Sequence, residues 1–148
     1  MRSAADSQHR AATTTSPATS AAGIALRAAL GTMWISHALL KVFVFTLPGA
    51  SKFFVSVGLP GELVYPVVAA ELLGGLAILA GFYGRQVSLL LSPILLAAPW
   101  VHLPNGWVFT APNGGGEYPV FLLAASLAHW LIGDGAYATR RSNLLVPA

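Results

Sequence analysis

The stretch Pro60–Gly84 constrains the fold of this chain more than any other. It is mostly apolar and longer than the roughly 20 residues that a helix needs to cross a bilayer. Glu71, near its middle, is the only charged side chain between Glu62 and Arg85. A charge at that depth costs a few kcal/mol, so such a residue normally faces protein or a polar cavity. We therefore predict a membrane helix that points Glu71 at neighbouring helices.

Two stripes of small residues predict close packing between helices. Small side chains at the spacing of one helix face let two helix backbones approach each other. One stripe lies in this stretch and the other in the apolar stretch that precedes it: Ala70, Gly74, Ala77 and Gly81; and Ala28, Thr32 and Ser36.

The composition indicates a small integral membrane protein. Of its 148 residues, 55% are hydrophobic and only 9% are charged, against roughly 25% charged residues in soluble domains. Several of the eight basic residues flank apolar stretches, so the net charge of +3 indicates membrane topology rather than a nucleic-acid surface. Because the chain has no cysteine, disulfides, thiol redox chemistry and thiolate-bound metals within it are excluded.

Four apolar stretches predict an all-α, four-helix transmembrane bundle over residues 23–137. They run from about Gly23 to Phe45, from Pro60 to Gly84, from Gln86 to about Leu103, and from Glu117 to about Ile132. The third stretch contains Pro93 and Pro99, each of which removes a backbone hydrogen bond, so its helix is expected to be kinked.

The remaining segments are predicted to be tails and connectors. Residues 1–22 are rich in Ala, Ser and Thr without apolar periodicity, which predicts a disordered tail. A cleaved secretory signal is the alternative, but its apolar core would be too long and would contain Arg27, His37 and Lys41. Residues 138–148 are expected to form a short second tail, and residues 48–61 a connector at the membrane surface.

The basic residues divide unequally between the two sides of the predicted bundle. One side has a single lysine in its loops, Lys52, whereas the other carries Arg2, Arg10, Arg85, Arg140 and Arg141. Because cytoplasmic loops carry an excess of Lys and Arg, both tails are predicted to be cytoplasmic. The expected location is the plasma or inner membrane.

In that orientation the four helices bring polar side chains to one layer in the outer half of the bilayer. This layer is predicted to contain His37, Lys41, Glu71, His102 and Glu117. His37 and Lys41 share a helix face, where a nearby carboxylate would relieve repulsion between their charges. Convergence from four helices favours a site that binds a ligand or relays protons.

Each member of the layer also has a purely structural interpretation. In one such interpretation, Glu71 and Lys41 form an ion pair whose only role is to fix the register of their helices. In the others, His37 donates an interhelical hydrogen bond, His102 is solvated at the membrane surface, and Glu117 interacts with its helix dipole.

A second set of polar residues is predicted at the inner end. Arg27 and Asp134 are expected to form a structural ion pair there between the first and fourth spans, and Arg27 is also long enough to snorkel. His129 is expected at the interface. No spacing typical of a hydrolytic triad, a phosphate-binding loop or a metal-ligand cluster occurs.

Five motifs, taken in order, resemble the DoxX family of small membrane proteins. They are Arg27, Gly31, His37 and Lys41; Gly58-Leu59-Pro60; Glu71-Leu72-Leu73-Gly74-Gly75; His102-Leu103-Pro104-Asn105-Gly106-Trp107; and Gly116-Glu117-Tyr118-Pro119. The resemblance covers about Gly23 to Tyr137. Ala38 departs from it, because the family commonly has glycine after this histidine.

The resemblance implies a four-helix membrane bundle linked to respiratory redox chemistry. Relatives include the small subunit of thiosulfate:quinone oxidoreductases and membrane partners of detoxifying oxidoreductases. The leading hypothesis is therefore a membrane subunit of a quinone-linked oxidoreductase complex, in which the polar layer binds a quinone head group or relays its protons. With no evident electron carrier of its own, the chain would need a redox partner protein, and any activity would belong to the complex.

Three alternatives remain open at this point. A transporter or proton-linked channel for a small solute fits the polar layer and the proline-broken helix, although so short a chain would have to form a homo-oligomer. A non-catalytic membrane anchor would use the polar layer only for helix register. A haem ligated by His37 and His102 is the third.

Overall fold

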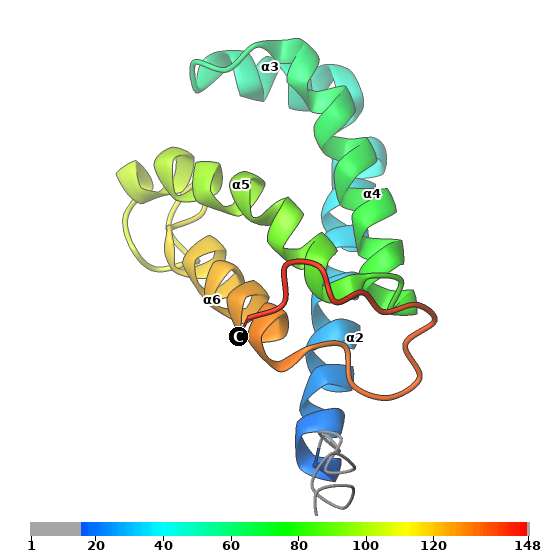
Figure 1. Ribbon diagram of the computed structural model, residues 1–148. Coiled ribbons are helices and arrows are strands. Elements are labelled where there is room, and N and C mark those ends of the chain that lie inside the picture. Colours follow the sequence, from blue (N-terminus) through cyan, green and yellow to red (C-terminus); the bar gives the residue numbers. More distant parts are fainter. Residues whose placement is uncertain (1–15, 148) are drawn as a thin grey trace, which may run out of the picture.

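The structure is a computed structural model that describes residues 16–147, and this part of the chain is built from helices (Figure 1). Residues 16–147 contain no β-strand, only an isolated bridge between Phe82 and Arg140. The α-helices are α2 (Pro17–Leu39), α3 (Leu47–Ser56), α4 (Val64–Ala80), α5 (Gly84–His102) and α6 (Glu117–Ile132). Three short helices join them: the π-helix η1 (Leu40–Val44) and the 3-10 helices η2 (Gly61–Leu63) and η3 (Leu103–Asn105). The predicted all-α class is confirmed.

Three of the helical segments are long and apolar enough to cross a membrane. They are Pro17–Val44, Gly61–Ala80 and Gly84–Asn105, judged by length and composition. The fourth predicted span, α6, is apolar but has 16 residues, which at 1.5 Å per residue give about 24 Å. This is less than the roughly 30 Å hydrocarbon core of a bilayer. The four predicted apolar helices are therefore present, and the last is short.

The boundary predicted for the N-terminal tail is wrong, because α2 begins at Pro17 rather than near Gly23. The Ser16 side chain accepts a hydrogen bond from the Thr19 amide at 3.1 Å, which caps the helix, and Pro17 fits its first turn. Tertiary contact also holds this turn, since Ser20 Oγ accepts a hydrogen bond from the Ala136 amide at 2.8 Å. The rest of the predicted tail, residues 1–15, lies outside the described residues.

The segment predicted as a connector contains the helix α3. Thr46 caps it by accepting a hydrogen bond from the Gly49 amide at 3.2 Å, and Pro48 lies in its first turn. Figure 1 shows α3 at the end of the molecule opposite the start of α2. We call this the α3 end, and the end where α2 begins and α6 stops the terminal end.

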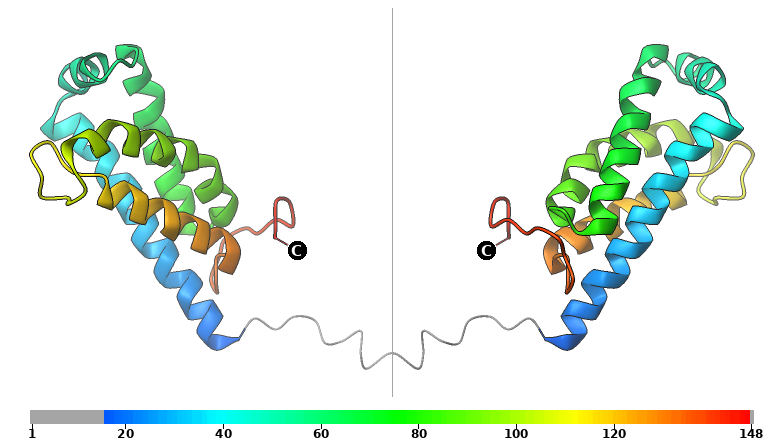
Figure 2. Two further views of the ribbon diagram at one scale, coloured as in Figure 1. Left: turned by 90° about the vertical axis from the view of Figure 1, so that its left-hand side faces the viewer. Right: turned by 90° about the vertical axis from the view of Figure 1, so that its right-hand side faces the viewer.

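The bundle consists of two closely packed helix pairs, α2 with α4 and α5 with α6 (Figure 2). Glycines set the approach of α2 to α4: a Cβ on Gly75 would lie 2.9 Å from the Ile35 amide nitrogen, and one on Gly31 would lie 2.9 Å from the Gly75 carbonyl. Gly74 instead faces Leu91 of α5. The stripe predicted on the first span is wrong, since Ala28, Thr32 and Ser36 are exposed.

A compact core joins the two pairs. Its buried side chains come from α2, α4, α5 and α6: Leu30, Met33, Trp34, Ile78, Leu91, Leu95 and Leu122. Beyond this core, towards the α3 end, α5 curves along its length (Figure 2). Pro93 and Pro99 lie inside α5, and each deprives the carbonyl four residues earlier of its helical donor. The bend agrees with the predicted kink.

Candidate functional site

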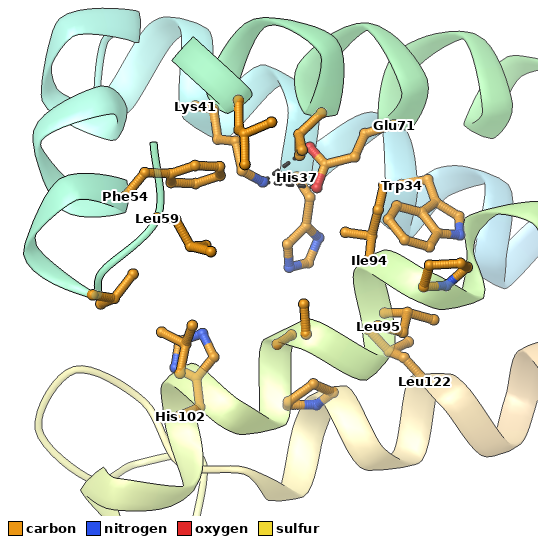
Figure 3. Close-up of a pocket in the computed structure, with 18 of the residues that line it drawn as sticks. Trp34, His37, Lys41, Phe54, Leu59, Glu71, Ile94, Leu95, His102 and Leu122 are labelled. Carbon is orange, nitrogen blue, oxygen red and sulfur yellow. Dashed lines mark hydrogen bonds and ion pairs between the residues drawn. The ribbon is translucent and has the colours of Figure 1, made fainter. Parts of the chain in front are cut away.

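A cavity of about 410 Å³ lies between the two helix pairs and under α3 (Figure 3). Its walls are mostly apolar and include side chains from α2, α3, α4, α5 and α6, among them Trp34, Phe54, Val67, Ile94, Leu95 and Leu122. Besides the indole of Trp34, five side chains with polar groups line it: His37, Lys41, Glu71, His102 and Tyr118. Four of the five residues predicted for the polar layer are thus brought to one cavity.

Lys41 and Glu71 form an ion pair on the cavity wall. Lys41 Nζ lies 2.8 Å from Glu71 Oε1 and 2.9 Å from Oε2, so the ammonium group donates to both carboxylate oxygens. The Glu71 side chain is 4% exposed and that of Lys41 is 18% exposed. Lys41 belongs to η1, and such π-turns within helices are frequent at functional sites.

His37 points its ring into the cavity (Figure 3). Its Nδ1 lies 2.9 Å from the Met33 carbonyl oxygen, which only accepts, so Nδ1 carries a proton and Nε2 remains available to a ligand. The ring is nearly parallel to that of Tyr118, with centroids 5.8 Å apart and an angle of 15° between the planes. Tyr118 is a cavity residue that was not predicted from the sequence, where it was noted only within the motif Gly116-Glu117-Tyr118-Pro119.

His102 lies on the wall opposite His37 (Figure 3). Its Nδ1 is 3.2 Å from the Asn113 carbonyl oxygen, so the loop between α5 and α6 orients the ring and leaves Nε2 available. The Asn105 side chain holds the same loop by donating to the Gly114 carbonyl at 3.0 Å. The two imidazoles therefore present Nε2 atoms from helices α2 and α5.

Glu117 is not among the residues that line the cavity. Its Oε2 accepts a hydrogen bond from the Phe109 amide at 3.2 Å, across the loop that precedes α6. This contact stabilises the loop, so the structure separates Glu117 from the four cavity residues that were predicted with it.

The predicted ion pair between the side chains of Arg27 and Asp134 does not form. Arg27 Nη1 donates to the backbone carbonyl of Asp134 at 3.3 Å, while Asp134 Oδ1 lies 3.2 Å from His129 Nε2. Arg27 is 8% exposed and points into the bundle rather than snorkelling. The two residues are adjacent, as predicted, but the carboxylate pairs with a histidine.

His129 forms part of a buried polar cluster between α5 and α6, not an interfacial contact as predicted. Its side chain is fully buried, and Ser88 Oγ lies 2.8 Å from its Nδ1. Nε2 lies 3.2 Å from Asp134 Oδ1 without forming a hydrogen bond to it.

The cluster of Ser88, His129 and Asp134 was not predicted from the sequence. It does not have the arrangement of a hydrolytic triad. The serine contacts Nδ1 and the aspartate Nε2, the reverse of the usual arrangement, and Ser88 is fully buried. The cluster joins α5 to α6. Ser88 and Ser92, two hydroxyl residues within the apolar part of α5, were a sequence signal for it.

Within residues 16–147, no group of three or more histidine, aspartate or glutamate side chains is placed to hold a metal ion. The cavity instead combines hydrogen-bonding groups on facing walls with apolar surfaces between them. Such a site suits a small, mostly apolar molecule that carries a few polar atoms.

A known family matches the part of the chain that contains most of these cavity residues. The sequence model of the DoxX family matches residues 22–103, which include His37, Lys41, Glu71 and His102. No curated protein and no solved structure matches the chain. Because the matched region exceeds half of the sequence, this membrane protein belongs to the DoxX family.

Proposed function

We propose that this protein is the membrane subunit of a quinone-linked oxidoreductase complex and binds a quinone head group in the cavity. The observation that carries the proposal is the cavity itself, with apolar walls and with His37, His102 and the Lys41–Glu71 pair around it. A volume of about 410 Å³ falls within the range of small-molecule sites, roughly 300–1,000 Å³.

The chemistry of a quinone supports this assignment. A quinone ring is flat and apolar on both faces, and its two carbonyl oxygens lie at opposite edges. His37 and His102 lie on facing walls with their Nδ1 atoms engaged, so Nε2 of each is the atom that meets a ligand. Trp34, Phe54 and Leu95 supply apolar contacts for the ring.

Proton transfer is the role we assign to the polar side chains. Reduction of a quinone to a quinol takes up two electrons and two protons, so protons must reach both oxygens. His37 and the Lys41–Glu71 pair are ionisable groups at the cavity wall, and intramembrane groups of this kind commonly serve as proton relays. The electrons come from a partner redox protein in this proposal.

Entry from the bilayer is supported by the exposure of several lining residues. Phe53 and Leu63 line the cavity but are 44% and 40% exposed, so the cavity is open beside α3 and η2. A head group that enters there leaves its isoprenoid tail among the lipids. The distribution of charge supports termini in the cytoplasm and a cavity in the outer half of the membrane, since Arg85, Arg140 and Arg141 lie at the terminal end.

The proposal is tested by titrating detergent-purified protein with a short-chain quinone analogue. Glu71→Gln and His37→Ala are expected to weaken binding about tenfold or more, because each removes a hydrogen bond to a polar or charged group in an apolar site. The matched control is Glu62→Gln, which makes the same change at an exposed residue outside the cavity.

The control is expected to bind like the wild type. An absence of quinone binding in the wild type, or equal losses in Glu71→Gln and Glu62→Gln, would count against the proposal and in favour of an anchoring role.

A further inference from the structure

Three guanidinium groups converge on the turn Gly133–Gly135 at the terminal end, away from the cavity. Arg27 reaches it from α2 and donates to the Asp134 carbonyl oxygen at 3.3 Å. Arg141 reaches it from the C-terminal segment and donates to the Gly135 carbonyl oxygen. Arg85, in the first turn of α5, lies beside Gly133, where a Cβ would be 3.5 Å from its Nη1.

Arg85 also binds the end of α6. Its Nε donates to the Trp130 carbonyl oxygen at 2.9 Å and its Nη2 to the Leu131 carbonyl oxygen at 3.1 Å. These contacts satisfy carbonyl groups that have no partner within the helix. Because backbone carbonyls carry no net charge, these contacts do not neutralise the guanidinium group.

Within residues 16–147, none of the three arginines forms an ion pair with a carboxylate. Asp134 is the acidic side chain at this turn, and its Oδ1 lies 3.2 Å from His129 Nε2 rather than against an arginine. All three guanidinium groups donate to backbone carbonyls instead. The turn therefore carries an excess of positive charge that a bound anion would offset.

A pocket of about 180 Å³ adjoins this turn. Arg85 and Arg141 line it, together with Ser142 and Asn143, whose side chains offer further hydrogen-bond donors. Asp134 also lines it, so two guanidinium groups outnumber one carboxylate at the pocket. Ile132 and Val146 also line it, so a charged part and an apolar part lie together. The pocket lies where α5 begins and α6 ends, the level at which spanning helices meet lipid headgroups.

We propose that this pocket binds a phosphate group, with an anionic phospholipid headgroup as its expected source. A guanidinium group donates charge-assisted hydrogen bonds to phosphate oxygens, and two guanidinium groups line the pocket. Arg85 already uses Nε and Nη2 on the carbonyls of α6, so its Nη1 and the guanidinium of Arg141 are the donors that would meet the phosphate. Ile132 and Val146 suit the ester-linked part of a lipid. The inference is independent of the quinone proposal because the two sites share no lining residue.

Neighbouring arginines provide a matched test. Arg141 lines the pocket, whereas Arg140 does not, and the Arg140 guanidinium lies over the Tyr83 ring at 5.7 Å from its centroid. Arg141→Gln and Arg140→Gln change the net charge equally, so only a site effect separates them. Arg141→Lys retains the charge but loses the guanidinium group. Arg85 is left intact because it also holds the end of α6.

The measurement is native mass spectrometry of delipidated, detergent-purified protein with dioctanoyl phosphatidylglycerol, dioctanoyl phosphatidylcholine or inorganic phosphate. We expect phosphatidylglycerol to bind in preference to phosphatidylcholine. Arg141→Gln is expected to weaken that binding about tenfold or more, and Arg141→Lys by less. Arg140→Gln and Glu71→Gln are expected to bind phosphatidylglycerol like the wild type.

The other outcomes are equally decisive. Inorganic phosphate that binds alone and depends on Arg141 would support the same phosphate chemistry with a soluble source. Equal binding of the two lipids, equal losses in Arg140→Gln and Arg141→Gln, or no binding of any probe would overturn the proposal. Loss of quinone binding in Glu71→Gln with phosphatidylglycerol binding retained would keep the two sites separate.

Discussion

The Lys41–Glu71 pair places two opposite charges in an apolar part of the bundle. Removing both charges from water is costly, and their attraction offsets this cost only while both partners are present. The short distances of 2.8 and 2.9 Å between Nζ and the two carboxylate oxygens show that they are closely matched. The pair thus holds η1 to α4 and keeps a charged group at the cavity wall.

Breaking this pair on one side is expected to destabilise the protein by roughly 3–5 kcal/mol, because Glu71→Ala leaves the Lys41 ammonium group without its partner. The double variant Lys41→Met with Glu71→Leu removes both charges and is expected to recover most of that loss. Denaturant unfolding in detergent measures both effects.

The double variant also separates structure from ligand binding. A role limited to helix register predicts that the double variant retains any quinone binding of the wild type. A ligand-binding role predicts a stable protein that no longer binds the analogue.

The neighbours of a residue could be predicted from the sequence where its depth in an apolar helix determines what surrounds it. Glu71 and Lys41 are such a case, since both lie near the same level of adjacent predicted spans. The partner of Asp134 could not be predicted in this way, because it depends on the backbone of the following turn. Gly133 and Gly135 there adopt φ values of +91° and +69°, and this path brings Asp134 to His129.

At the scale of helices, the crossing of α2 and α4 determines the position of the cavity wall. Both cavity residues of the ion pair depend on this crossing, since Lys41 follows α2 and Glu71 belongs to α4. Gly31 and Gly75 permit the approach because neither has a side chain at the contact. A larger residue at either position forces the helices apart.

Gly75→Ala is expected to destabilise the protein by about 1–3 kcal/mol, because its Cβ would lie 2.9 Å from Ile35 Cγ1, Ile35 N and Trp34 Cβ. Gly49→Ala in α3 is the control, since the nearest atom to its Cβ would be Thr46 Oγ1 at 3.3 Å. Thermal unfolding in detergent compares the two. A Gly75→Ala variant as stable as Gly49→Ala would show that the crossing is not tight.

The long helices could be predicted from the sequence. Which face of each helix packs against its neighbours, and the presence of the short helix α3, could not. The Ala28, Thr32 and Ser36 stripe has the spacing of a packing face, yet the contact runs through Gly31 and Trp34 instead. Large apolar residues occur on both faces of a membrane helix, so hydrophobicity does not mark the buried one. The α3 segment contains Pro48, Gly49 and Ser51, which are also typical of loops.

For the whole molecule, two tight helix pairs diverge around a cavity that polar groups line from several elements. The predicted polar layer contained His37, Lys41, Glu71 and His102 because helix depth alone brings them to one level. It missed Tyr118 and included Glu117, since depth does not show which of two adjacent residues faces inward. The cavity itself, its volume and the cover supplied by α3 required the three-dimensional arrangement.

Photolabelling with a photoreactive quinone analogue in native membranes tests the proposed site most directly. We predict labelling within Met33–Lys41 and Pro93–His102, competed by unlabelled quinone and reduced in Glu71→Gln but not in Glu62→Gln. Labelling spread over lipid-facing residues such as Leu73 and Leu90, without competition, would contradict a quinone site in this cavity.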